Sequence, residues 1–325
     1  MKQKTGIKNT LKNETVTLLL VAIVVVIVYQ SLNNAYLSAI NIRTLLASAS
    51  VCGVLAVGLT CLLISGQIDL SSASVGCLSA ILLALMLNAG LPWYVSLLLV
   101  VLFGALTGLI VSFFVYVLKI PAFIATLALA SIYQGFARFA AGNKTQAISD
   151  KAIWALGDTL FGILPIPFLI MAILLVIYGI ILARTVVGRK IYVCGGNPSA
   201  ARLAGLDLKK IHTVLFINCG ALGAFAGCLM AARMQTASQN AVIGSDIDAI
   251  TAIVLGGVAF TGGKGSMVGS FVGLMLLSCF KNGLIGLRAP TYSQIAAQGA
   301  ILILALAADF LRQRALTKSM KHIRT

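Results

Sequence analysis

Long runs of apolar residues, separated by short polar or glycine-rich breaks, make up most of this chain. A helix needs about 20 apolar residues to cross a bilayer, and most of the runs approach that length. Their continuous apolarity, as over residues 16–28, differs from the alternating pattern of membrane barrel strands. The pattern predicts an all-α polytopic membrane protein, a single domain over residues 1–325, with about ten transmembrane helices. The expected spans are residues 16–32, 45–65, 72–87, 93–118, 122–140, 165–183, 213–232, 247–260, 267–280 and 294–311.

Composition agrees with a membrane protein and argues against a nucleic-acid partner. Hydrophobic residues make up 60% of the chain and charged residues 10%, whereas about a quarter of an ordinary soluble domain is charged. A net charge of +16 would suggest nucleic acid as the partner of a soluble protein. Here the basic residues lie between apolar runs, so membrane topology explains them, and we expect membrane lipid and no nucleic acid as a partner.

The distribution of basic residues predicts the orientation of the chain. With a cytoplasmic N-terminus, all but seven of the 24 Lys and Arg residues fall on the cytoplasmic side, as the positive-inside rule requires. We therefore expect a multi-pass protein of the cell (inner or plasma) membrane with both termini cytoplasmic. The seven residues expected on the other side are Arg43, Arg138, Lys144, Lys151, Arg233, Lys281 and Arg288.

The first apolar run could instead be a cleaved secretory signal, because Lys12 precedes it and small residues follow it at 35–39. Its removal would leave an odd number of crossings and would place the basic loop at residues 184–211 outside, against the charge rule. We expect it to be retained as the first helix.

Two breaks interrupt the apolar sequence in a way that is typical of discontinuous helices. The first reads SGQIDLSS at residues 65–72, and the second reads TGGKG at residues 261–265, between the short expected spans 247–260 and 267–280. Short spans beside a glycine turn suggest broken or re-entrant helices. The pairs Ile68-Asp69 and Ile247-Asp248 are expected to open one short helix in each half, which would indicate an internal duplication.

The chain shows no catalytic or metal-binding pattern of its own. Its seven cysteines lack paired spacing, and its two histidines, His212 and His322, are expected at solvated helix ends, so we predict no disulfide and no metal site. The glycine-rich stretch at 256–266 is not a phosphate-binding loop, because Val258 and Gly265 stand where that motif needs a glycine and a hydroxyl. ATP hydrolysis, if it drives this protein, must then come from another chain.

Two carboxylates, Asp69 and Asp248, are those most expected within the membrane, where a charge usually faces a cavity. Each could instead cap the helix that follows it, and we favour capping. Nearby polar groups could hydrogen-bond a polyhydroxylated solute in transit, or simply join helices to one another. The residues predicted along a translocation pathway are Gln67, Asp69, Ser71, Ser72, Phe123, Thr126, Asp248 and Thr251.

The longest basic connection, residues 184–211, contains a short predicted helix. Asn197 is a suitable N-cap, Pro198 a suitable first residue, and Gly205 a suitable stop. Ala200, Ala201 and Ala204 are expected to leave a narrow surface that a groove of another protein can accept. The alternative is a plain connecting helix at the lipid headgroups.

At this loop the sequence resembles a known family. GRKIY followed by GGNPSAARLAGL is similar to the loop that couples ribose-type permeases to their ATPase, and SGQIDLSS, PAFIATL, DAITAIVL, GGKG and NGL match the same family in order. The resemblance covers about residues 45–310. Ser199 stands where the coupling motif of importers usually has an acid. The residues that the resemblance assigns to coupling are Asn197, Pro198, Ser199, Ala200, Ala201, Arg202, Leu203, Ala204 and Gly205.

The resemblance implies a permease subunit of a simple-sugar ATP-binding-cassette (ABC) importer. Its implied partners are a cytoplasmic ATPase that carries ATP and Mg, an extracytoplasmic solute-binding protein, and a second permease copy or homologue. The main alternative is an ion-driven secondary transporter of a small polar solute, which would not need the coupling loop. A membrane-embedded enzyme is disfavoured, because the expected spans lack histidine, a metal-ligand cluster and a nucleophile with a base. Pentose, hexose and nucleoside all stay open as solutes.

Overall fold

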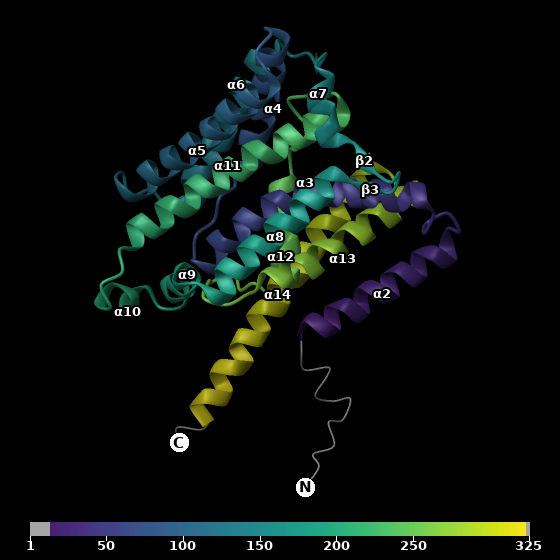
Figure 1. The fold of residues 1–325 in the computed structure, drawn as a ribbon. Coiled ribbons are helices and arrows are strands. Elements are labelled where there is room, and N and C mark those ends of the chain that lie inside the picture. Colours follow the sequence, from purple (N-terminus) through teal and green to yellow (C-terminus); the bar gives the residue numbers. More distant parts are fainter. Residues whose placement is uncertain (1–13, 323–325) are drawn as a thin grey trace.

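A computed structural model describes the backbone of residues 14–322 and the side chains of residues 16–307 and Phe310 (Figure 1). The described chain is a bundle of long helices with a few very short strands. The helices are α2 (Glu14–Leu32), α3 (Ala39–Ile64), α4 (Ser72–Asn88), α5 (Trp93–Tyr116), α6 (Ala122–Ala141), α7 (Lys151–Trp154), the 3₁₀ helix η1 (Ala155–Gly157), α8 (Ile166–Arg184), α9 (Val186–Gly196), α10 (Pro198–Leu203), α11 (Leu208–Met234), α12 (Ser245–Leu255), α13 (Met267–Gly286) and α14 (Thr291–His322).

Six helices of the described chain are long and apolar enough to cross a membrane, namely α3, α5, α6, α8, α11 and α13. Shorter apolar stretches occur in α2, in α4 and at the start of α14. These features confirm the all-α polytopic class. The expected spans at 93–118 and 122–140 differ from α5 and α6 by at most two residues at either end.

The glycine turn does break the chain between α12 and α13, but the prediction that residues 267–280 form a short span is wrong. Helix α13 runs for 20 residues to Gly286. It continues past Lys281 and Asn282 because other helices satisfy both side chains: Lys281 pairs with Asp248 at 2.5 Å, and Asn282 accepts a hydrogen bond from Asn41 at 2.8 Å. Helix α12, by contrast, is shorter than expected, with 11 residues.

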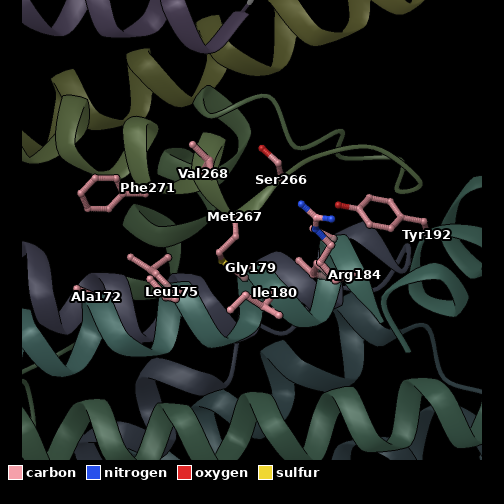
Figure 2. Close-up of a pocket in the computed structure, with 13 residues that line it drawn as sticks. Ala172, Leu175, Gly179, Ile180, Arg184, Tyr192, Ser266, Met267, Val268 and Phe271 are labelled. Carbon is pink, nitrogen blue, oxygen red and sulfur yellow. The ribbon is translucent and has the colours of Figure 1, made fainter. Parts of the chain in front are cut away.

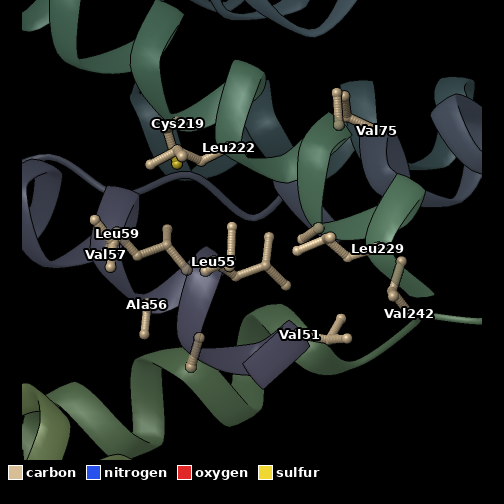
Figure 3. Close-up of a cluster of buried hydrophobic side chains, with 14 of the residues drawn as sticks. Val51, Leu55, Ala56, Val57, Leu59, Val75, Cys219, Leu222, Leu229 and Val242 are labelled. Carbon is tan, nitrogen blue, oxygen red and sulfur yellow. The ribbon is translucent and has the colours of Figure 1, made fainter. Parts of the chain in front are cut away.

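Helix α3 forms the centre of the bundle. Of its most apolar stretch 89% is buried, against 33% for α5 and 22% for α8. It packs against α8, α11, α12 and α13. Figure 3 shows Val51, Leu55 and Leu59 of α3 near Leu222 and Leu229 of α11. The bundle therefore buries α3 in protein and leaves the outer faces of α5, α6 and α8 for lipid.

Small residues let α5 and α11 cross at close range. A Cβ added at Gly108 would lie 2.1 Å from the carbonyl oxygen of Phe216, and one at Gly104 would lie 2.5 Å from that of Gly220. Gly104 and Gly108 form the small-xxx-small spacing that brings membrane helices together. Glycine is required at this crossing because any side chain would push the two backbones apart.

The bundle has two distinct ends. One, which we call the α10 end, carries α9, α10, the start of α2 and the last turns of α14 (Figure 1). The other, the α7 end, carries α7, η1 and two antiparallel strand pairs: β1 (Gln146–Ala147) with β4 (Thr236–Ala237), and β2 (Thr159–Leu160) with β3 (Leu164–Pro165). The long helices run between these ends, so the loop at residues 185–207 and the turn after α12 lie at the α10 end.

Candidate functional site

The loop between α8 and α11 folds into two consecutive helices. The Thr185 hydroxyl accepts a hydrogen bond from the backbone N–H of Gly188 at 3.2 Å and caps α9. The sequence pattern did not predict α9, although Thr185 is a residue type that favours a helix N-cap. The Asn197 side chain accepts from the N–H of Ala200 at 2.9 Å and caps α10, as expected.

Helix α10 ends as its glycine predicts. Gly205 has a φ of 77°. Its N–H donates to the carbonyl oxygen of Arg202, and the N–H of Leu206 donates to the carbonyl oxygen of Ala201, both at 3.0 Å. This pair of bonds is the Schellman arrangement that closes a helix C-terminus. The expected boundaries at Asn197 and Gly205 are confirmed.

The exposed surface of α10 differs from the one expected. Leu203 is 91% exposed, whereas Ala201 is completely buried beside Cys194 and Leu208. The prediction that Ala201 faces a partner is wrong, because Ala201 lies on the side of α10 that packs onto its own loop. The other residues assigned to coupling are exposed: Asn197, Pro198, Ser199, Ala200, Arg202, Leu203, Ala204 and Gly205.

Helix α11 begins five residues before the expected span, and this places His212 inside the bundle. Asp207 caps the helix by accepting from the N–H of Lys210 at 3.0 Å, a bond that lowers the pKa of the Asp207 carboxyl. The His212 ring is hydrogen-bonded to the Tyr116 hydroxyl and lies 3.1 Å from the Ser65 carbonyl oxygen. The prediction of a solvated His212 is therefore wrong, while the side chain of His322 lies outside the described part of the chain.

Three glycine segments from distant parts of the sequence meet at the α10 end, and we call this contact the glycine junction. It consists of Gly66, Gly195–Gly196 and Gly262–Gly263. The N–H of Gly263 donates to the Ile64 carbonyl at 2.8 Å. A Cβ at Gly195 would lie 1.9 Å from the same carbonyl oxygen. The junction joins the loop at residues 185–207 to both sequence breaks through backbone atoms.

Asp69 is buried and organises the first break. Its Oδ1 accepts from the backbone N–H of Ser71 at 2.7 Å and from the Ser71 hydroxyl at 2.6 Å. Ser71 is the N-cap of α4 and Ser72 its first residue, and both are buried, while Gln67 is half-buried. The carboxylate thus holds the linker just before α4 and does not itself occupy the N-cap.

Asp248 does not cap α12, contrary to expectation. The helix begins at Ser245 after Gly244, so Asp248 lies in its first turn. The Asp248 Oδ2 atom pairs with the Lys281 ammonium of α13 at 2.5 Å. The two Ile-Asp pairs therefore have different local structures, and the internal duplication stays a prediction.

The remaining pathway candidates lie on α6 and α12. Buried Thr126 and Thr251 donate to carbonyls of their own helices, at 2.8 Å to Ala122 and 2.7 Å to Ile247. Phe123 is 52% exposed on the outer face of α6. Their role along a pathway stays a prediction.

Two cavities lie beside these elements. One of about 440 Å³ separates α8 from the start of α13 and is apolar, with Arg184 and Tyr192 at one end (Figure 2). The other, of about 200 Å³, lies among α3, α12 and α13 around Asp248 and Lys281. Within the described residues, no group of three His, Cys, Asp or Glu side chains could hold a metal ion.

Comparison with known proteins then places the chain. A family model described as "Branched-chain amino acid transport system / permease component" matches residues 41–306. The chain belongs to this family. The loop at 184–211 of the permease and both breaks lie inside the matched region. Members of the family are transport components and not enzymes.

Several curated permeases are similar along most of their length. Ribose import permease protein RbsC of Haemophilus influenzae is 32% identical over 291 residues, 88% of this chain and 90% of the relative. L-arabinose ABC transporter permease protein AraH of Azospirillum brasilense is 31% identical over 278 residues, 86% of this chain and 82% of the relative. Probable ABC transporter permease protein YphD of Escherichia coli is 32% identical over 306 residues, 93% and 92% of the two chains. No solved structure matches the permease.

Proposed function

We propose that this permease is the membrane-spanning subunit of an ABC importer for a monosaccharide or a similar polyhydroxylated solute. The relatives named for ribose and arabinose support this solute class. The capped α9–α10 loop supports ATP-driven transport, since an ion-driven transporter has no need of such a loop. In this proposal ten helices cross the membrane: the six long ones together with α2, α4, α12 and α14.

The α10 end is cytoplasmic in this proposal, and so are both termini. Basic residues of the described chain gather at that end, among them Arg189, Lys190, Arg202 and the pair Lys209–Lys210. Basic residues favour the cytoplasmic side. The α7 end then faces the extracytoplasmic solute-binding protein.

Helix α10 is the docking element for the ATPase, and ATP and Mg belong to that partner. The observation that carries this assignment is Leu203, a large apolar side chain that is 91% exposed on a rigidly capped helix at the basic end of the bundle. An apolar anchor of this kind gains energy only when a partner pocket covers it. Ser199 and Ala200 are exposed on the same short helix and leave room for close approach.

Force from the ATPase passes from α10 to the membrane helices through the glycine junction. Gly195 and Gly196 end α9, directly before the cap of α10, and they touch the backbone of both breaks. Because backbone atoms meet there without intervening side chains, a displacement of α9 displaces the end of α3 and the turn between α12 and α13. ATP binding thus biases the permease pair between outward-facing and inward-facing states.

Uptake measurements test the proposed function. Cells with and without the permease are given radiolabelled D-ribose or L-arabinose, and uptake is measured with cellular ATP held constant and an uncoupler present or absent. We expect permease-dependent uptake of at least one pentose that survives the uncoupler. Uptake that collapses with the uncoupler would favour the ion-driven alternative, and the lack of any permease-dependent uptake would overturn the proposed solute class.

A further inference from the structure

The cavity around Asp248 and Lys281 is walled by two polar stripes. On α3, Asn41, Thr44 and Ser48 line it at helical spacing. On α13, Ser278, Lys281 and Asn282 do the same. The stripes belong to the start of α3 and the second half of α13, so the cavity lies in the half of the bundle nearer the α7 end. Polar stripes within apolar helices turn toward protein or a cavity, because lipid cannot satisfy them.

Some of these polar side chains form hydrogen bonds that hold the helices together. The Asn41 amide donates to the Asn282 side chain at 2.8 Å and to the Tyr36 carbonyl at 2.6 Å. The Arg233 guanidinium reaches the Ser48 hydroxyl at 3.4 Å. These bonds tie α3 to α13 and to the end of α11, and they give the cavity a rigid wall.

The ion pair at the centre has unused bonding capacity. The Asp248 Oδ2 atom takes the Lys281 ammonium, but its Oδ1 atom is buried without a hydrogen-bond partner among the described residues. An ammonium carries three donors, and the side chain of Lys281 is 32% exposed. A carboxylate with an oxygen that lacks a donor is costly, and the Asp248 side chain is 15% exposed beside the cavity. This site therefore favours a ligand that brings a hydroxyl to the carboxylate.

We infer that this cavity is a transient binding site for one monosaccharide-sized polyol on its way through the permease, which rests on the proposed function. A solute hydroxyl donates to the partly exposed Asp248 carboxylate, and a neighbouring hydroxyl accepts from the Lys281 ammonium. The volume of about 200 Å³ corresponds to roughly seven waters at about 30 Å³ each. That space matches a single small ring and is too small to enclose a disaccharide.

Protection from thiol modification tests occupancy directly. Ser48→Cys lines the cavity, and Arg43→Cys is an exposed control on the same helix that does not line it. Both are made in a chain whose seven cysteines are replaced. The purified proteins react with a small thiosulfonate reagent in D-ribose raised to about 100 mM, so that a site with a millimolar dissociation constant is filled, or in sucrose at the same concentration.

We expect ribose, and not sucrose, to slow modification of the Ser48→Cys protein by about twofold or more, with no effect on the Arg43→Cys protein. Equal rates in the two sugars would overturn the inference if wild-type cells take up ribose; if they take up only L-arabinose, that pentose replaces ribose in the test. If wild-type cells take up neither pentose, the proposed function fails, and this inference fails with it. Protection at both positions would indicate a general effect of ribose and would also overturn the site.

A double substitution separates solute binding from a purely structural ion pair. Removing one member of a buried pair destabilises a protein, while replacing both is often neutral. The double variant Asp248→Leu/Lys281→Met should therefore be expressed as well as wild type. Its uptake should still be at least about tenfold lower than that of wild type, because the solute can no longer form hydrogen bonds with the two charged side chains. Recovery of uptake in the double variant, after loss in each single one, would show that the pair only holds α12 to α13.

Discussion

Truncation of Leu203 should weaken the complex between the permease and its ATPase without harming the permease. The side chain is 91% exposed and packs on nothing that the fold needs. Leu203→Ala therefore leaves the membrane bundle unchanged. Leu203→Glu should leave it equally intact, because the new carboxylate stays in water until a partner covers it.

The magnitude follows from the area that docking would cover. Burying a leucine side chain contributes about 1.5–3 kcal/mol, and truncation to alanine should remove about 2 kcal/mol of this. The dissociation constant should then rise about 30-fold. The glutamate variant should show no stable complex, since an unpaired carboxylate in an apolar interface costs at least several kcal/mol.

Purified permease variants are incubated with the ATPase, and the retained ATPase and the rate of solute uptake are measured. Ile40→Ala is the matched control, because Ile40 is 81% exposed but belongs to the start of α3, at the α7 end. It should retain the ATPase as wild type does. Full ATPase retention and full uptake with Leu203→Glu would refute the assignment of α10 as the docking helix.

Three further predictions concern the junction, the first break and the topology. Gly195→Ala should lower the thermal stability in detergent and the uptake rate, because its Cβ would lie 1.9 Å from a carbonyl oxygen of α3. Gly196→Ala, whose Cβ would have its nearest neighbour at 3.6 Å, should behave as wild type. Similar losses in both variants would argue against the junction. Asp69→Asn keeps an oxygen that can accept the hydrogen bonds from Ser71, so this variant should retain most uptake. Asp69→Leu should lose about 1–3 kcal/mol of folding free energy and most uptake. Equal loss of uptake in both variants would mean that the negative charge itself is needed. An impermeant thiol reagent applied to intact cells should label Asn143→Cys and not Arg202→Cys in a cysteine-free chain, and labelling of both would contradict the proposed orientation.

The parts of the structure that depend on local chemistry could be predicted from the sequence. Apolar runs predicted the helices α5 and α6. The Asn197 cap and the Gly205 stop predicted both ends of α10, because caps and stops involve atoms only a few residues apart. The end of α13 could not be read in this way. Its Lys281 looks like a helix boundary until Asp248, on another helix, is known to face it.

The sequence close to a residue also could not predict whether its side chain is buried or exposed. Ala201 and His212 lie in a polar loop that reads as exposed, and both are buried because α9 and α11 pack against that loop. The glycine junction joins three motifs that were recognised separately, and nothing in each motif indicates its partners. In the candidate site, sequence could therefore nominate chemistry, but tertiary packing decides which groups meet.

The burial of α3 also bears on how the chain is made. Membrane helices enter the bilayer in chain order as synthesis proceeds, so α3 is inserted before α8, α11, α12 and α13, which later cover it, have been translated. It must first be stable as a lone helix in lipid, which its leucines and valines ensure. It must later exchange lipid for protein on nearly every side, which the small residues Ala49, Ser50 and Gly53 permit. The same composition thus serves two successive surroundings, and a larger side chain at Gly53 would impair assembly of the finished bundle after an insertion step that succeeds.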